Sequence, residues 1–334
     1  MSNPTKRLLS GRVTGRILKG ALYEWNEDKV PRMAAAIAFY AVFSLTPIVV
    51  IAFKIAERRF GSEVALREIL AQAAFLIGQE GVAAVELLIQ HGQPRTTSRL
   101  DAALGIGAMI FAATGVFTEL KDSLNTIWEV QPKPGLGLMQ MVRDRFFAFA
   151  MVLVIWFLML ISLVTSAAMT AVTRVATAYW SGFQVFEAAF SLALITLLFA
   201  LIYRVVPDVK VAWRDVWRGA LVTAGLFVVG KSLFGLYLGH SSLGNSYGAA
   251  GSLVIVILWT YYSCLILLFG AEMTQVEARL HHAPLEPTHE AVHVTEHARA
   301  QQGIPRTEDI KEAVREETQT PSGDRKEPQR GDSE

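Results

Sequence analysis

An uncharged run of 23 residues, from Ala249 to Ala271, determines the class of fold that this chain can adopt. As an α-helix rising about 1.5 Å per residue, the run is about 35 Å long, which is enough to cross a bilayer. In water such a helix would need apolar cover on every face, whereas lipid tails supply that cover and the helix satisfies its own backbone hydrogen bonds. The run therefore predicts an integral membrane protein.

Five further apolar stretches have the length of membrane spans. With residues 249–272 they predict an all-α, polytopic membrane helical bundle of six transmembrane helices. The five stretches are residues 33–53, 102–118, 146–173, 184–206 and 216–238. Pro47 lies inside the first of them, where it removes one backbone hydrogen bond and predicts a kink.

Residues 62–91 do not fit a span, although they are apolar on one face. Gly78-Gln79-Glu80-Gly81 interrupts them, and neither half is long enough to cross a bilayer. We expect two amphipathic helices, which form either an extracytoplasmic cap or a re-entrant hairpin.

The distribution of cations gives the orientation of the bundle. With the N-terminus in the cytoplasm, 23 of the 31 Lys and Arg residues fall on cytoplasmic segments, seven on outer segments, and Lys231 inside a span. Cytoplasmic loops of membrane proteins carry such an excess of Lys and Arg. We therefore expect both termini to be cytoplasmic and residues 62–91 to add no net crossing.

The two ends of the chain differ in character from the spans. Residues 1–32 carry seven cations and three acids, with no apolar stretch of the kind that a cleavable signal peptide needs. Their apolar residues recur at helical spacing, which fits either an interfacial helix on the anionic inner leaflet or a flexible basic arm. Residues 279–334 are rich in proline and acids and predict a mostly disordered cytoplasmic tail, with a short helix near residues 307–318.

Motifs in several spans resemble those of one family, the YihY/virulence factor BrkB family, formerly mislabelled ribonuclease BN. In the last span they are Tyr247-Gly-x-x-Gly251, Leu258-Trp259-x-Tyr261-Tyr262 and Leu268-x-Gly270-Ala271-Glu272. Elsewhere they are Phe39-Tyr40…Ser44-Leu-Thr-Pro47, Ser123-Leu-Asn125-Thr-Ile127-Trp128 and Trp213-Arg-Asp215…Gly219. The resemblance covers about residues 20 to 280 and implies a multi-pass protein of the bacterial inner membrane. It implies no settled substrate, although members are discussed as transporters.

Lys231 is the first candidate for a functional residue, because a cation within a span costs several kcal/mol unless it is paired, solvated or able to snorkel. Lys231 and Pro47 lie at similar depths, about 18 Å and about 21 Å from the inner ends of their spans. This predicts a substrate cavity formed by Lys231, Ser44, Pro47 and Tyr40. Tyr247 lies in a short outer loop, where it is a candidate for the substrate entrance, although a plain hairpin turn explains that loop better. In the alternative interpretation, Lys231 only snorkels to the outer interface or holds helices together.

A second candidate is a polar inner gate. Glu119 and Glu272 lie at the inner ends of the second and sixth spans, where Arg204 or Arg218 could join them. Such residues are more often simple interface anchors. Lys231 lies too far along the bilayer normal to pair with Glu272.

The sequence favours no enzyme, cofactor or metal site. Cys264 is the single cysteine, and the evenly spaced His289, His293 and His297 lie in the polar tail, which favours a solvated segment over a metal site. Gly225 to Ser232 matches the phosphate-binding loop pattern, but the match lies inside an apolar span. Clustered His and Asp ligands and a basic-aromatic surface are missing from the predicted membrane domain, which argues against a nuclease and against nucleic acid as a partner.

A transporter or permease for an anionic or amphipathic substrate, such as a lipid, accounts for the intramembrane lysine, the proline and the glycine-rich spans. The alternative is a non-transporting scaffold that organises envelope proteins. The expected partners are membrane lipids, the substrate and envelope proteins. The sequence leaves the coupling ion and the oligomeric state open.

Overall fold

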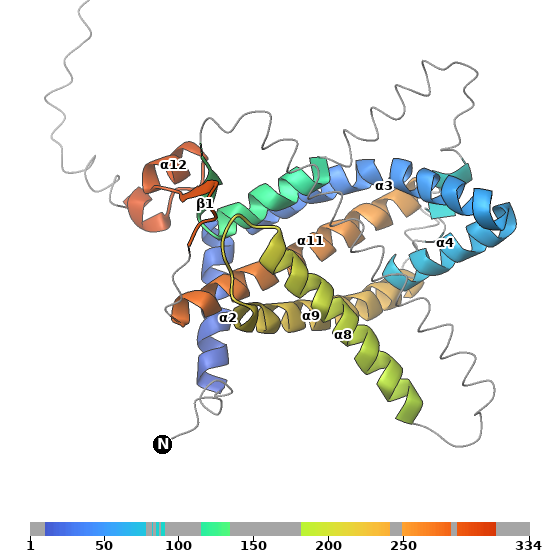
Figure 1. Ribbon diagram of the computed structural model, residues 1–334, viewed down its shortest axis with the longest axis horizontal. Coiled ribbons are helices and arrows are strands. Elements are labelled where there is room, and N and C mark those ends of the chain that lie inside the picture. Colours follow the sequence, from blue (N-terminus) through green and yellow to red (C-terminus); the bar gives the residue numbers. More distant parts are fainter. Residues whose placement is uncertain are drawn as a thin grey trace, which may run out of the picture. The chain divides into compact units, whose positions relative to one another are not determined.

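The computed structural model describes residues 11–77, 82, 85, 86, 88–90, 115–133, 182–240, 249–281 and 286–311 (Figure 1). These residues are mostly helical. The chain divides into two compact units, Met1–His293 and Val294–Glu334, which are treated separately below.

The first unit begins with helices α2 (Gly11–Glu27), α3 (Val30–Phe60) and α4 (Ser62–Ile77). Helix α3 has Pro31 in its first turn and continues as one element through Pro47. It ends at Gly61, whose φ of 85° only glycine adopts easily and whose N–H donates to the Glu57 carbonyl. The kink at Pro47 stays a prediction.

Helix α4 folds back along α3. Val49 and Phe53 of α3 share a buried apolar cluster with Ala65 and Ala73 of α4 and with Val85 and Ile89. The described residues from 82 to 90 are helical as well. Whether this assembly is a cap or a re-entrant hairpin stays a prediction.

Three helices among the described residues are long and apolar enough to cross a membrane. They are α8 (Gly182–Val205), α9 (Trp213–His240) and α11 (Ala249–Leu280), with apolar portions Ala188–Val205, Trp213–Phe234 and Val254–Leu280. Helix α9 packs against α8 and α11, and α11 runs between α9 and α3 (Figure 1). The fully buried Trp128, Tyr203 and Leu268 belong to the core of this bundle.

These three helices correspond to the predicted spans 184–206, 216–238 and 249–272. The predicted spans 102–118 and 146–173 lie outside the described residues, apart from residues 115–118, which begin a helical segment over 115–127. The apolar part of α3 that is described runs from Val30 to Ser44.

Helix α11 continues eight residues beyond the predicted end at Glu272. The polar residues of this extension are not solvated as their sequence suggests. Thr274, Gln275 and Glu277 are buried, and Gln275 donates to the carbonyl of Ile127. Contacts with other segments therefore carry the helix past the end of its apolar run.

Part of the segment that we expected to be disordered is ordered. Strand β2 (Ala291–His293) pairs antiparallel with β1 (Val130–Pro132), with Val130 opposite His293. Pro287 forms an isolated bridge with Val209. Three-residue strands carry too little alternation to be recognised in a sequence, and their partners here are distant in the chain.

The second unit contains α12 (Glu296–Gln301). The hydroxyl of Thr295 caps this helix by accepting from the N–H of Ala298. Residues 307–311 are also helical and coincide with the start of the short helix expected at 307–318.

Candidate functional site

One end of the bundle gathers four segments that are far apart in the sequence, and we call it the polar end. It comprises residues 24–29, 119–133, 204–218, and 272–281 together with 286–293. Its best-buried ion pair joins Lys121 Nζ to Asp208 Oδ2 at 3.0 Å, with both side chains about nine-tenths buried. The amide of Asn125 donates to the same carboxylate at 3.0 Å and accepts the backbone N–H of Asp208 at 2.8 Å. Asp208 therefore makes three contacts with the side chains of Lys121 and Asn125.

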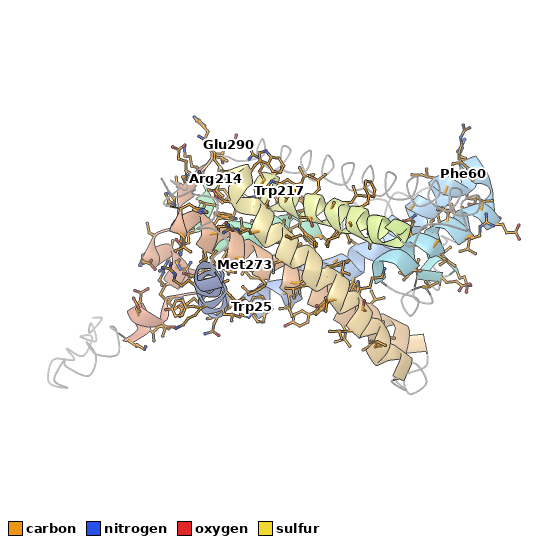
Figure 2. All side chains as sticks on the ribbon, turned by 90° about the horizontal axis from the view of Figure 1, so that it is seen from below. Trp25, Phe60, Arg214, Trp217, Met273 and Glu290 are labelled. Carbon is orange, nitrogen blue, oxygen red and sulfur yellow. The ribbon has the colours of Figure 1, made fainter. Side chains whose placement is uncertain are left out.

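Arg279 at the end of α11 ties two further segments to the polar end. Its guanidinium contacts Glu24 of α2 at 3.0 Å and Glu129 at 2.9 Å. Helix α2 also packs on α11 through Ile17, Ala21 and Met273. The Trp25 ring lies edge-on to the Phe269 ring of α11, with centroids 5.6 Å apart; Trp25 and Met273 are labelled in Figure 2. The N-terminal helix therefore docks on the bundle by one face.

The opposite face of α2 is open in the described structure. Leu18 and Leu22 are 44% and 55% exposed, and Arg16 and Lys19 are exposed as well. Exposed apolar residues beside cations fit the predicted interfacial helix. Its contact with the inner leaflet stays a prediction.

Helices α9 and α11 approach each other closely through glycines. A Cβ atom added to Gly219 would lie 2.5 Å from the Gly270 carbonyl oxygen, so only glycine fits there. Next to this contact, the Tyr203 hydroxyl donates to the Leu267 carbonyl at 2.8 Å and lies 2.8 Å from the Thr223 hydroxyl. The close approach is thus combined with buried hydroxyl groups inside the bundle.

Four side chains next to this contact form what we call the Asp215–Glu277 cluster: Asp215 and Arg218 of α9, Glu277 of α11 and His281. His281 Nδ1 lies 3.1 Å from Asp215 Oδ1, and Arg218 contacts Glu277 Oε1 at 2.9 Å. The carboxylate side chains are only 1% and 3% exposed, whereas Arg218 is 32% exposed. Buried charges of this kind need partners, and each carboxylate has one.

Aromatic side chains mark the start of α9. The rings of Trp213 and Trp217 stack with centroids 6.1 Å apart and are 40% and 43% exposed. The guanidinium of Arg204 lies 4.6 Å from the centre of the Trp213 ring and donates to the Val211 carbonyl. Trp217 and the neighbouring Arg214 are labelled in Figure 2. Exposed tryptophans beside cations are typical of a membrane–water interface.

The residues of the predicted inner gate all belong to the polar end. Arg204 lies at Trp213 and Arg218 pairs with Glu277. Glu272 is fully buried on α11, and Glu119 is half-buried on the helical segment 115–127, where burial raises the pKa of its carboxyl. The gate itself stays a prediction, since the arginines have partners that the sequence did not suggest.

The residues of the predicted cavity are distributed over several helices. Lys231 is half-buried on α9, and the adjacent Gly230 packs against the Tyr262 ring of α11. On α3, Ser44 is buried, and its hydroxyl donates to the Ala41 carbonyl at 2.9 Å. The Tyr40 ring lies edge-on to the Phe39 ring, with the ring centroids 5.7 Å apart. The side chain of Pro47 and all of Tyr247 lie outside the described residues, so the cavity and the substrate entrance stay predictions.

The contacts of α9 with α11 also locate Lys231 along the bundle. Gly219 contacts Gly270, whereas Gly230 contacts Tyr262, so the two helices run antiparallel. Lys231 is 12 residues beyond Gly219, or about 18 Å along the helix. A long separation between Lys231 and Glu272, as expected from the sequence, follows from this geometry.

The Asp215–Glu277 cluster and the Lys121–Asp208 pair were not singled out from the sequence. A signal for the first was present in the residues after Glu272. Thr274, Glu277 and His281 are spaced by three and four residues and so share one helix face, which predicts a partner for that face. The second depends on side chains 87 positions apart and has no local signal.

Within the described part of the chain, no group of three or more His, Cys, Asp or Glu residues is arranged to hold a metal ion. The three evenly spaced histidines do not share a helix: His289 lies in a turn, His293 on β2 and His297 on α12. Cys264 is buried and free.

Comparison with known proteins supports the resemblance found in the motifs. A family model described as Virulence factor BrkB matches residues 21–294. The chain is 27% identical to a UPF0761 membrane protein of Ralstonia nicotianae over 252 residues, which cover 75% of this chain and 56% of that protein. It is 27% identical to one of Cronobacter sakazakii over 275 residues, which cover 79% of this chain and 90% of that protein.

A UPF0761 membrane protein of Alteromonas mediterranea is 29% identical over 255 residues, which cover 75% of this chain and 83% of that protein. The match thus spans little more than half the length of the Ralstonia relative and most of the other two. No solved structure matches the chain.

Proposed function

From the premise that the chain belongs to the Virulence factor BrkB family of membrane proteins, we propose that it is a multi-pass transporter or permease of the bacterial inner membrane. The substrate class that we propose is an anionic or amphipathic molecule, with an anionic lipid as the first candidate. Six transmembrane helices with both termini in the cytoplasm form the proposed frame.

The contacts at the polar end support an even number of crossings between its segments. Asp208 contacts Lys121, so the chain returns to the same end of the bundle between residues 133 and 204. Helix α8 supplies one crossing there, and the predicted span 146–173 would supply the second. Arg279 contacts both Glu24 and Glu129, so residues 30–119 also need an even number of crossings to return the chain to the polar end. There α3 and the predicted span 102–118 are the two crossings.

The observation that carries the proposed function is the position of Lys231. It is half-buried inside a membrane-length helix and lies beside Val228, Val229 and Leu233, which are 43%, 54% and 59% exposed among the described residues. A cation placed next to a lipid-facing apolar surface can neutralise an anionic head group while the apolar surface contacts the acyl chains. This combination supports an amphipathic, anionic substrate better than a neutral solute.

The test is lipid identification by native mass spectrometry on gently extracted protein. Wild type is compared with Lys231→Met, Lys231→Arg and a control, Lys54→Met, whose lysine is 47% exposed and pairs locally with Glu57. A charge-assisted contact is worth about 1.5 kcal/mol, so we expect occupancy by anionic lipid to fall roughly tenfold in Lys231→Met alone. Equal retention in all four proteins would refute the role of Lys231.

A second measurement addresses transport itself. The four proteins are reconstituted into vesicles that contain a fluorescent anionic lipid, and movement of that lipid between leaflets is followed by quenching from outside. We expect Lys231→Met to lose most of the wild-type rate and Lys231→Arg to keep it. Folded wild-type protein that leaves the lipid in its leaflet would contradict lipid transport and favour the scaffold.

A further inference from the structure

The Asp215–Glu277 cluster brings two buried carboxylates to the contact between two membrane helices. Asp215 lies in the first turn of α9 and Glu277 in the last turns of α11, and their side chains are 1% and 3% exposed. Arg218 of α9 contacts Glu277 and His281 contacts Asp215, so both carboxylates belong to one cluster at the contact of the two helices. Two like charges at close range in a buried site favour uptake of a proton by one of them.

Among the described residues, few positive charges from the neighbouring elements face these carboxylates. Arg218 pairs with Glu277 and is one third exposed, and Arg214 reaches Asp215 Oδ1 at 3.4 Å with 68% of its side chain exposed. Of the other elements packed here, α2 contributes Glu24, which is paired with Arg279, and α8 contributes Arg204, which lies on Trp213. Water screens the exposed Arg214 strongly, so the buried part of the cluster carries one excess negative charge.

One oxygen of the cluster lacks a hydrogen bond. Asp215 Oδ2 is buried and has no hydrogen-bond partner among the described residues, whereas Oδ1 of the same carboxylate contacts His281. An ionised carboxylate oxygen in this condition is costly, because it has given up water and gained no donor. A proton removes that cost by neutralising the charge.

We propose that Asp215, Glu277 and His281 form a proton-binding site at the polar end of the α9–α11 pair. The site takes up one proton on an oxygen of one of its two carboxylates, and no other bond forms or breaks. The buried excess charge falls from minus one to zero. The proton belongs to the coupled group and not to one residue.

Proton uptake changes how α9 is held to α11. The contact between Arg218 and Glu277 joins the two helices and is an ion pair only while Glu277 is charged. Neutralising the carboxyl weakens this tie directly above the close contact of Gly219 with Gly270. If the protein transports its substrate as proposed, this change links proton binding to the arrangement of the two helices, and this link rests on the proposed function.

The test is infrared difference spectroscopy on the full chain in lipid, as the pH falls from about 8 to about 5.5. An exposed carboxylate with a pKa near 4 stays ionised over most of this range, so a new carboxylic C=O band reports a proton held by a buried group. We expect the band in wild type and in the control Glu286→Gln, whose glutamate is 61% exposed. We expect its loss or a clear frequency shift in both Glu277→Gln and Asp215→Asn.

Several outcomes would overturn the site. They are a wild-type protein without the band, a band unchanged in both variants, and a shift of the ionised carboxylate bands on adding Na⁺ at constant pH in place of the carboxylic band, which would assign a metal cation instead. If one variant fails to fold, the other and His281→Gln carry the test, with size-exclusion behaviour as the check of folding.

Vesicle transport with and without a pH gradient separates this inference from the proposed function. A wild-type band without transport of the lipid would remove the proposed function and leave the proton-binding site in place. Transport of the lipid without the band would remove the proton-binding site and leave the proposed function in place.

Discussion

Replacing Gly219 by alanine should separate α9 from α11. The added Cβ atom would lie 2.5 Å from the carbonyl oxygen of Gly270, and the Thr274 hydroxyl occupies the same space. Real Cβ atoms essentially never come within 3.0 Å of a heavy atom that is distant in the chain. Because the carbonyl belongs to the backbone of a helix, it cannot rotate away as the end of a flexible side chain would.

The expected cost follows from this geometry. Overpacking a close-packed contact costs about 1–3 kcal/mol, and the helix gains back up to about 1 kcal/mol when glycine becomes alanine. Gly225 provides a matched control on the same helix, since an added Cβ meets nothing within 4 Å among the described residues. Gly225→Ala should therefore be neutral or mildly stabilising.

The assay is thermal unfolding of purified protein in mild detergent, followed by the loss of the monodisperse peak. At the 2–4 °C per kcal/mol typical of chains of about 150–250 residues, a net loss of up to about 3 kcal/mol lowers the midpoint by up to roughly 12 °C. We expect that fall for Gly219→Ala alone. Equal midpoints for the two variants, or a larger fall for Gly225→Ala, would refute the close packing of α9 on α11.

Two further predictions concern buried polar contacts and use the same assay. Lys121→Met leaves the buried Asp208 without the lysine of its ion pair and should cost about 3–5 kcal/mol of stability. Lys210→Met breaks a pair with Glu286 whose side chains are both more than 60% exposed, so it should change the stability little. Similar losses in the two variants would contradict the burial of Asp208. Tyr203→Phe removes the hydroxyl between Thr223 and the Leu267 carbonyl and should cost about 1–2 kcal/mol, and an unchanged midpoint would argue against that network.

The membrane helices α8, α9 and α11 could be predicted from the sequence because their signal is local. A long apolar run specifies a span without reference to any other part of the chain. The boundaries were less predictable. Helix α11 continues to Leu280 because Gln275 and Glu277 find buried partners, and such partners are not visible in a hydropathy pattern.

The polar end could not be predicted because its contacts are not local. Asn125 and Asp208 are 83 positions apart, Lys133 and His289 are 156 apart, and Glu24 and Arg279 are 255 apart. The charges of these residues indicated only that their segments lie outside the membrane. Their pairing depends on how many times the chain crosses between them.

We propose that the four segments of the polar end lie together on the cytoplasmic face. The direct measurement is cysteine labelling in whole cells with a membrane-impermeant maleimide, after replacing the single native cysteine by Cys264→Ala. The exposed reporter positions are Asn26→Cys, Lys133→Cys, Lys210→Cys and Glu286→Cys, with Arg59→Cys as the outer control.

We expect the four reporters to react only after the cells are permeabilised, and Arg59→Cys to react in intact cells. Labelling of some of the four in intact cells and not of others would contradict the polar end as one cytoplasmic assembly. Labelling of all four in intact cells would contradict the orientation.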